Sequence, residues 1–180
     1  MQKKRFPYST KIRNQILPCL LLASLSLPLV SSAQELEDDI NDKEWKEISL
    51  QLPPAPKAEN LLAFYKNGNQ SFSLDAKSLS VASDGSIRYT LVSSSSSGAK
   101  NISYEGLRCQ TAEKKLYAFG RTDGTWSRSR RNQWDPISST DFNKQHITLA
   151  LEYFCEGKTN AGKADQILGR MTRNQPMKSY

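Results

Sequence analysis

The sequence predicts an α+β fold: an antiparallel meander sheet of about six or seven strands, then one or two C-terminal helices packed on one face. Three observations lead to this fold class. Turn dipeptides recur at short intervals, apolar and polar residues alternate between them, and a helical pattern comes only after the strands. A single α+β domain is expected to span residues 61–171.

Three dipeptides separate segments that suit strands: Asn67-Gly68, Asp84-Gly85 and Asp123-Gly124. Type I′ turns need a positive φ at both central residues, and Asn-Gly and Asp-Gly tolerate this best. Connections of this length allow only antiparallel pairing. The strand pairs predicted from these turns are 61–66 with 70–75, 79–83 with 86–92, and 116–122 with 125–130.

The alternation of apolar and polar residues supports the strand over 86–92 and adds one further strand on the other side of a serine-rich loop. Three apolar residues share one face of the strand before the loop, with polar residues between them: Ile87, Tyr89 and Leu91. A second strand follows over 101–109, and Gly106 inside it is predicted to mark a bulge. The serines at 93–97 predict a flexible hairpin loop between these two strands.

The first helix is predicted within residues 139–157. A Ser, Thr or Asp at 139–141 can cap its start, and Gly157 can end it. Four apolar residues at helical spacing form the stripe that is expected to face the sheet: Ile147, Ala150, Leu151 and Phe154. A weaker second helix is predicted over 161–171, and residues 172–180 are predicted to fray.

Residues 1–33 are predicted to be a signal peptide for the general secretory route. A basic start without acids precedes an apolar stretch over 16–30, and Ser31-Ser32-Ala33 offers the small residues that cleavage needs. A permanent membrane helix wants about 20 unbroken apolar residues, but two prolines interrupt this stretch. No transmembrane segment is therefore expected after cleavage. Cys19 opens the apolar stretch instead of following it, so lipidation is not predicted.

The charge of the mature chain argues against a nucleic-acid partner. The whole chain has a formal charge of +7, but its leader holds five cations and no acid, so cleavage leaves +2. The strongly basic balance typical of nucleic-acid-binding domains then disappears. The remaining charge is uneven, because residues 34–87 carry ten acidic and five basic side chains, whereas 88–180 carry eight acidic and fifteen basic ones.

Residues 34–60 are predicted to form an acidic, proline-rich N-terminal arm. Trp45 lies in a helix-compatible run over 42–50, and the prolines at 53, 54 and 56 end any regular element. One interpretation is a solvated segment that docks Trp45 on the body. The alternatives are an arm that binds a partner, and an acidic arm that lies on the basic half of its own domain or of a neighbour.

Cys109 and Cys155 are the cysteines that remain after cleavage, and they are predicted to form one disulfide. Such a bond implies an oxidising compartment, which agrees with export. It would also clamp the first helix onto the end of a strand.

Four segments of the chain resemble the cryptic neisserial protein-like family of small exported bacterial proteins. They are SFSLDAKSLSVASDGSIRYTL (71–91), NISYEGLRC (101–109), YAFGRTDGTW (117–126) and YFC (153–155). The resemblance runs from about Trp45 to Gly169 and implies a periplasmic protein. Some members of the family look like lipoproteins, but this chain lacks a cysteine behind its apolar stretch. The family has no assigned activity, so the resemblance supplies no chemistry.

The strand after Asp123-Gly124 carries the most suggestive candidate site. Trp126, Arg128 and Arg130 share one face if that strand continues, and Arg131 and Trp134 lie close by in sequence. Arginine binds carboxylate and phosphate groups and stacks on indole rings. These residues therefore suggest a face for an anionic glycan, a lipid head group or an acidic envelope protein. The alternative is a charged edge strand that blocks edge-to-edge pairing.

His146 is the single histidine of the chain. Metal sites need several converging ligands, so no metal and no other cofactor is expected. The position of His146 beside the apolar stripe predicts a helix-surface or half-buried side chain.

The favoured function is a non-catalytic periplasmic module with a binding or envelope-support role. The alternative is a small hydrolase that uses His146 on envelope material, although no Gly-x-Ser-x-Gly segment places a nucleophile.

Overall fold

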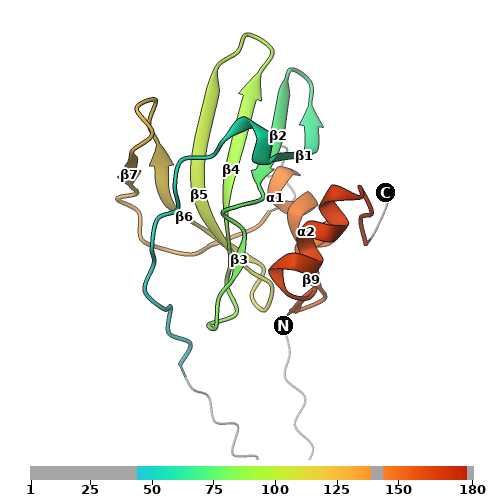
Figure 1. The fold of residues 1–180 in the computed structure, drawn as a ribbon. Coiled ribbons are helices and arrows are strands. Elements are labelled where there is room, and N and C mark those ends of the chain that lie inside the picture. Colours follow the sequence, from blue (N-terminus) through green and yellow to red (C-terminus); the bar gives the residue numbers. More distant parts are fainter. Residues whose placement is uncertain (1–43, 139–143, 178–180) are drawn as a thin grey trace, which may run out of the picture. The chain divides into compact units, whose positions relative to one another are not determined.

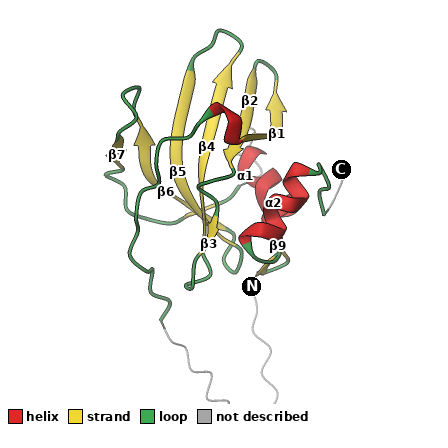
Figure 2. Cartoon of the chain, in the orientation of Figure 1, coloured by secondary structure: helices red, strands yellow, loops and turns green. Residues whose placement is uncertain are grey.

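A computed structural model describes residues 44–138 and 144–177, and its largest element is an antiparallel sheet (Figures 1 and 2). The strands are β1 (Leu61–Asn67), β2 (Gln70–Asp75), β3 (Ser80–Val81), β4 (Ile87–Ser95), β5 (Lys100–Arg108), β6 (Glu113–Gly120), β7 (Trp126–Arg128) and β8 (Asp135–Pro136). They follow the order β1-β2-β4-β5-β6-β7, with β3 paired to β4 and β8 paired to β6. The predicted antiparallel meander is confirmed.

The helical elements come after the sheet, as predicted. They are the short α1 (Lys144–Thr148), the π-helical segment η3 (Leu149–Phe154) and α2 (Ala164–Thr172). A two-stranded hairpin, β9 (Cys155–Glu156) and β10 (Thr159–Asn160), lies between η3 and α2, and a 3-10 turn, η1 (Ala58–Asn60), precedes β1. The helices gather on one side of the sheet, so the α+β fold class is confirmed (Figure 1). No helix in the described part of the chain is long and apolar enough to cross a membrane.

Several predictions fall outside the described residues. They concern the signal peptide (1–33), the acidic residues 34–43, the helix cap at 139–141 and the last three residues, 178–180. The described part of the tail, residues 173–177, makes main-chain hydrogen bonds to the helical elements. The amides of Gln175 and Met177 donate to the carbonyls of Arg170 and Glu152, so this segment is held against the helices.

The predicted stripe of the first helix was wrong in its register. The buried residues of α1 and η3 are His146, Leu149, Tyr153 and Phe154, instead of Ile147, Ala150 and Leu151. The π-helical segment turns less per residue than the α-helix assumed in the prediction. The helical run also ends at Phe154, because Cys155 already belongs to β9, and Gly157 serves the β9–β10 turn with a φ of +62°.

The hairpin turns lie where they were predicted, but they are not type I′. The Gly85 amide donates to the Ala82 carbonyl, and Gly85 alone in this turn has a positive φ, as in a type I turn followed by a left-handed glycine. The turn at Gly124 is built in the same way. The Asp84 carboxylate accepts hydrogen bonds from the Ser86 amide and hydroxyl, an arrangement that suits an ordinary φ at the aspartate.

The sheet buries a large cluster on the face that meets the helices. Its fully buried members include Leu74, Ile87, Tyr89, Leu107, Leu149, Phe154 and Ile167. A smaller cluster on the opposite face contains Tyr104, Tyr117 and Ala118, packed against Leu50, Leu52, Trp126 and Trp134. The N-terminal segment and the loop after β7 therefore cover the second face.

The irregularity in the pairing of β5 with β6 does not lie at Gly106. The register shifts between Tyr104 and Glu105 of β5, which leaves Tyr117 of β6 without a partner across the ladder. Gly106 has another role, because a Cβ there would lie 2.6 Å from the Tyr117 hydroxyl oxygen and 2.9 Å from the Trp134 ring. Its missing side chain makes room for the two rings.

Candidate functional site

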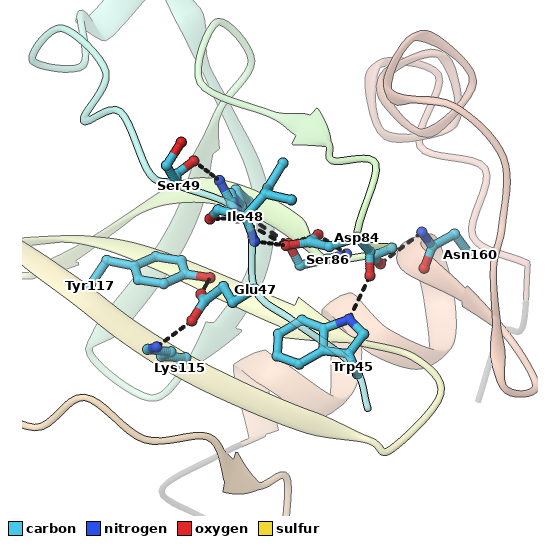
Figure 3. Close-up of polar contacts among 11 residues, drawn as sticks. Trp45, Glu47, Ile48, Ser49, Asp84, Ser86, Lys115, Tyr117 and Asn160 are labelled. Atoms are coloured by element: carbon cyan, nitrogen blue, oxygen red, sulfur yellow. Dashed lines mark hydrogen bonds and ion pairs between the residues drawn. The ribbon is translucent and has the colours of Figure 1, made fainter. Parts of the chain in front are cut away.

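An extended segment that we call the strap (residues 44–56) lies on the sheet face of Tyr104 and Tyr117. The indole nitrogen of Trp45 donates to the Asp84 carbonyl at 2.7 Å, so Trp45 docks on the body (Figure 3). The described part of the helix-compatible run over 42–50 is not helical. Its main chain is held instead by polar groups of the β3–β4 turn and of β4.

The buried guanidinium of Arg88 binds the main chain of the strap. It donates to the Ile48 carbonyl at 3.0 Å and to the Ser49 carbonyl at 3.2 Å, and it also pairs with Asp84 at 3.1 Å. The Asp84 carboxylate accepts a further bond from the Ile48 amide at 3.0 Å. Burial acts to raise the pKa of Asp84, but the hydrogen bonds from Ser86 and Ile48 outweigh it and lower that pKa.

Glu47 is the acidic side chain that the strap brings onto the body. Its carboxylate lies 2.5 Å from the buried ammonium of Lys115 and accepts a hydrogen bond of 2.6 Å from the Tyr117 hydroxyl (Figure 3). Burial and the bond to Glu47 raise the pKa of Tyr117, so this hydroxyl acts as a donor and not as a base. For Glu47 at least, the acidic half of the chain neutralises the basic half of its own domain.

Gly106→Ala is expected to loosen the strap and to lower the free energy of unfolding by about 2 kcal/mol, the usual cost of overpacking. The added methyl group would collide with the Tyr117 hydroxyl, which holds Glu47. Urea denaturation measures the loss, and limited trypsin digestion at the exposed Lys46 reports on the strap. Wild-type stability together with wild-type protection of Lys46 would contradict this arrangement.

Arg108 joins Trp45 and Trp134 into an aromatic cluster beside the strap. Its guanidinium carbon lies 3.7 Å from the centroid of the Trp45 ring and 5.5 Å from that of Trp134. The two indoles meet edge to face at 5.7 Å. Sequence patterns did not predict this role for Arg108, which ends β5 next to the disulfide cysteine Cys109.

The structure divides the predicted Trp/Arg face. Strand β7 ends at Arg128, so Arg130 does not continue its face. The Trp126 indole donates to the Pro53 carbonyl at 2.7 Å and packs 6.0 Å from Tyr104, and Trp134 joins the cluster of Arg108. The condition for a shared face of Trp126, Arg128 and Arg130 is therefore not met beyond Arg128, and both indoles contact the strap or the loops.

Two of the predicted residues line one groove, which lies between the strap and strands β6 and β7. Arg128 and Arg131 line this groove, which has a volume of about 340 Å³, together with Glu47 and Lys115. Glu47 compensates the charge of Lys115, and Asp135 pairs with Arg131 at 2.6 Å. Arg128 is exposed, and no residue in the described ranges accepts a hydrogen bond from it. The groove thus offers one uncompensated cation beside two paired ones.

His146 is buried, which corrects the predicted helix-surface or half-buried position. Its Nε2 atom lies 2.7 Å from Oε2 of Glu105, and the other carboxylate oxygen accepts a bond of 2.6 Å from the Ser103 hydroxyl. Tyr89 also donates to Glu105, at 3.2 Å. The hydrophobic pattern missed this position because Glu105, more than 40 residues upstream, supplies the polar partner that allows burial.

The order of these groups differs from that of a hydrolytic triad. The carboxylate lies between Ser103 and His146, whereas a triad places the imidazole between the hydroxyl and the carboxylate. Burial acts to raise the pKa of Glu105, but His146 and the Ser103 hydroxyl outweigh it and lower that pKa. The geometry describes a fixed polar pair that holds α1 on the sheet.

The predicted disulfide is present between Cys109 and Cys155, whose Cα atoms are 5.5 Å apart. It joins the end of β5 to β9, so it clamps the hairpin after the helical run instead of the helix itself. Within residues 44–138 and 144–177, no group of three or more His, Cys, Asp or Glu side chains is placed to hold a metal ion.

Comparisons with known proteins agree with the resemblance seen in the sequence. A sequence model of the CNP1-like family matches residues 40–172, from before the strap to the end of α2. Cryptic neisserial protein 1 from Neisseria gonorrhoeae (strain ATCC 700825 / FA 1090) is 28% identical over 170 residues, which cover 83% of this chain and 84% of that protein. No solved structure matches the chain. The chain therefore belongs to the CNP1-like family.

Proposed function

We propose that this protein is a non-catalytic binding module of the periplasm that holds an anionic partner in the groove between the strap and β6–β7. The observation that carries the proposal is the exposed guanidinium of Arg128 in that groove, beside Arg131 and Lys115. The leader-like residues 1–33 and the disulfide support an oxidising compartment outside the cytoplasm.

The chemistry of the groove favours phosphate or carboxylate groups on an extended partner, such as an anionic glycan or a lipid head group. A guanidinium presents a planar set of donors that matches both groups. The groove is open, and the strap residues Ile48 and Leu50 form its apolar side. Because Glu47 and Asp135 already compensate two of the cations, binding is expected to be moderate and sensitive to salt.

Arg128→Ser combined with Arg131→Ser is expected to weaken binding of the mature protein to anionic surfaces about tenfold, because two charge-assisted contacts are lost. Retention on heparin-agarose and co-sedimentation with phosphatidylglycerol vesicles measure the effect at low salt, and they distinguish a glycan from a lipid head group. Arg121→Ser combined with Arg130→Ser is the matched control, since both residues are exposed and neither lines the groove.

The comparison between the two double variants decides the outcome. Loss in the first pair alone supports the groove as the binding site. Equal losses in both pairs would mean that the net charge of the surface binds these probes, and would overturn the proposal. A wild-type protein that neither column nor vesicles retain would overturn it as well.

A further inference from the structure

We propose that a second pocket, beside the disulfide, binds a small molecule that carries a phosphate or carboxylate group on a ring-shaped body. We call it the disulfide pocket, and it has a volume of about 480 Å³. The residues that define it are Trp45, Arg108, Cys109, Gln110, Lys158 and Asn160. It shares no lining residue with the groove of Arg128, and its occupant does not depend on the function proposed above.

Four segments that are distant in the sequence build the walls of the disulfide pocket. The disulfide fixes the end of β5 to the β9–β10 hairpin. The side-chain amide of Asn160 donates to the Gly85 carbonyl at 3.0 Å, and the Trp45 indole donates to the neighbouring Asp84 carbonyl at 2.7 Å (Figure 3). One covalent bond and two hydrogen bonds therefore hold the strap, the β3–β4 turn and the hairpin around one space.

The electrostatics of the pocket favour an anion. Arg108 and Lys158 bring two cations to it. Glu113 accepts from Nη1 of Arg108 at 3.3 Å, but no other acceptor for this guanidinium lies among the described residues, and none for Lys158. The one carboxylate that lines the pocket, Asp84, is almost fully buried and is already bonded to Ser86, Arg88 and Ile48. Arg108 thus shares its charge with Glu113, and Lys158 is the uncompensated cation at the pocket.

The rest of the lining fits the body of a small ligand. Gln110 and Asn160 contribute amide groups that can bind phosphate or carboxylate oxygens. Trp45 adds an aromatic surface whose position is set by Arg108, 3.7 Å from its ring centroid. The volume lies within the range of about 300–1,000 Å³ that is typical of small-molecule sites. These features together point to a ring that contacts the indole while its anionic group meets Lys158 and Arg108.

Titration of the mature protein with phenyl phosphate tests the proposal. Saturable binding measured by calorimetry is expected, with a change in tryptophan fluorescence to which Trp45 and its neighbour Trp134 both contribute. Lys158→Ser is expected to weaken binding five- to tenfold, roughly the loss of one charge-assisted hydrogen bond. Lys158 is exposed in a turn, so this variant should fold normally. Lys66→Ser, at an exposed position of the edge strand β1, is the matched control and should bind like the wild type.

Three comparisons make the result decisive. Benzoate replaces the phosphate with a carboxylate and so identifies the preferred anion, and inorganic phosphate lacks the ring and should bind more weakly. The Arg128→Ser, Arg131→Ser double variant should bind phenyl phosphate like the wild type, which separates this pocket from the groove. The absence of saturable binding to phenyl phosphate and benzoate, unchanged affinity in Lys158→Ser, or inorganic phosphate binding as tightly as phenyl phosphate would each overturn the proposal.

Discussion

Replacing Cys109 and Cys155 together with serine is expected to lower the free energy of unfolding by about 4 kcal/mol. The disulfide closes a loop with a sequence separation of 46 residues. The chain-entropy model assigns roughly 4 kcal/mol to a loop of this length, because the cross-link restricts the unfolded chain. The loop contains β6, β7, β8, α1 and η3. Loss of the disulfide therefore loosens the part of the chain that carries the groove and His146. Urea denaturation of the wild type and of the variant measures the difference.

Reduced wild-type protein is the control for this variant, since it removes the bond without changing a residue and should show a similar loss. Thiol counting on denatured, unreduced protein isolated from whole cells is expected to find no free thiol at Cys109 or Cys155. Two free thiols there would contradict both the bond and the oxidising compartment. Equal stability of the oxidised and reduced proteins would contradict the energetic role of the disulfide.

His146→Ala is expected to lower the free energy of unfolding by about 3 kcal/mol at neutral pH. The substitution leaves the buried Glu105 carboxylate without its strongest partner. The side chains of the pair are 5% and 11% exposed, and 2.7 Å separates Nε2 from Oε2. Chemical denaturation measures the loss. The matched control replaces both members with leucine, and this variant should be closer to the wild type than His146→Ala because no unpaired charge remains.

The difference in the free energy of unfolding between the wild type and His146→Ala is expected to become smaller as the pH is lowered. The pKa of Glu105 is lowered in the folded protein, below its ordinary value of 4.5. The corresponding stabilisation is fully present above that value and is lost as the pH falls through the folded pKa. In the variant, the lowering contributed by His146 is absent, so the pKa of Glu105 is expected to lie higher than in the wild type. A gap that stays constant on acidification would contradict this assignment.

The same variant tests the hydrolase alternative. If the wild type releases fragments from isolated envelope material, and a folded His146→Ala protein does not, the buried pair would have a catalytic role. Turnover that survives the substitution would leave His146 as the residue that fixes α1 to the sheet.

The sequence was informative where structure depends on neighbours along the chain. Asn67-Gly68, Asp84-Gly85 and Asp123-Gly124 located three hairpins, since glycine in each supplies the positive φ that the turn needs. The disulfide was predictable because Cys109 and Cys155 are the two cysteines outside the predicted leader. The turn type was missed, because the Asp84 side chain competes with the left-handed conformation by accepting bonds from Ser86.

The candidate sites depend on long-range pairs, and these were not predictable from local patterns. Arg108 meets Trp45 from the strap, and His146 meets Glu105 from a central strand. Neither pair has a regular spacing. Arg128 at the end of β7 and Arg131 in the loop after it are both exposed and line one groove, as expected for charged side chains at a surface. The sequence pattern did not show that the Trp126 indole donates to the Pro53 carbonyl, because that contact joins residues 73 positions apart.

Arg88 recognises the strap through the carbonyl oxygens of Ile48 and Ser49, and every amino acid provides a carbonyl oxygen. The identities of residues 48 and 49 are therefore expected to drift among relatives without a change in the path of the chain, while the arginine and its aspartate partner at position 84 are expected to persist together. If an alignment of homologues showed constant residues at 48 and 49 and variable residues at 84 and 88, the side chains of this segment, and not its carbonyl groups, would determine its position.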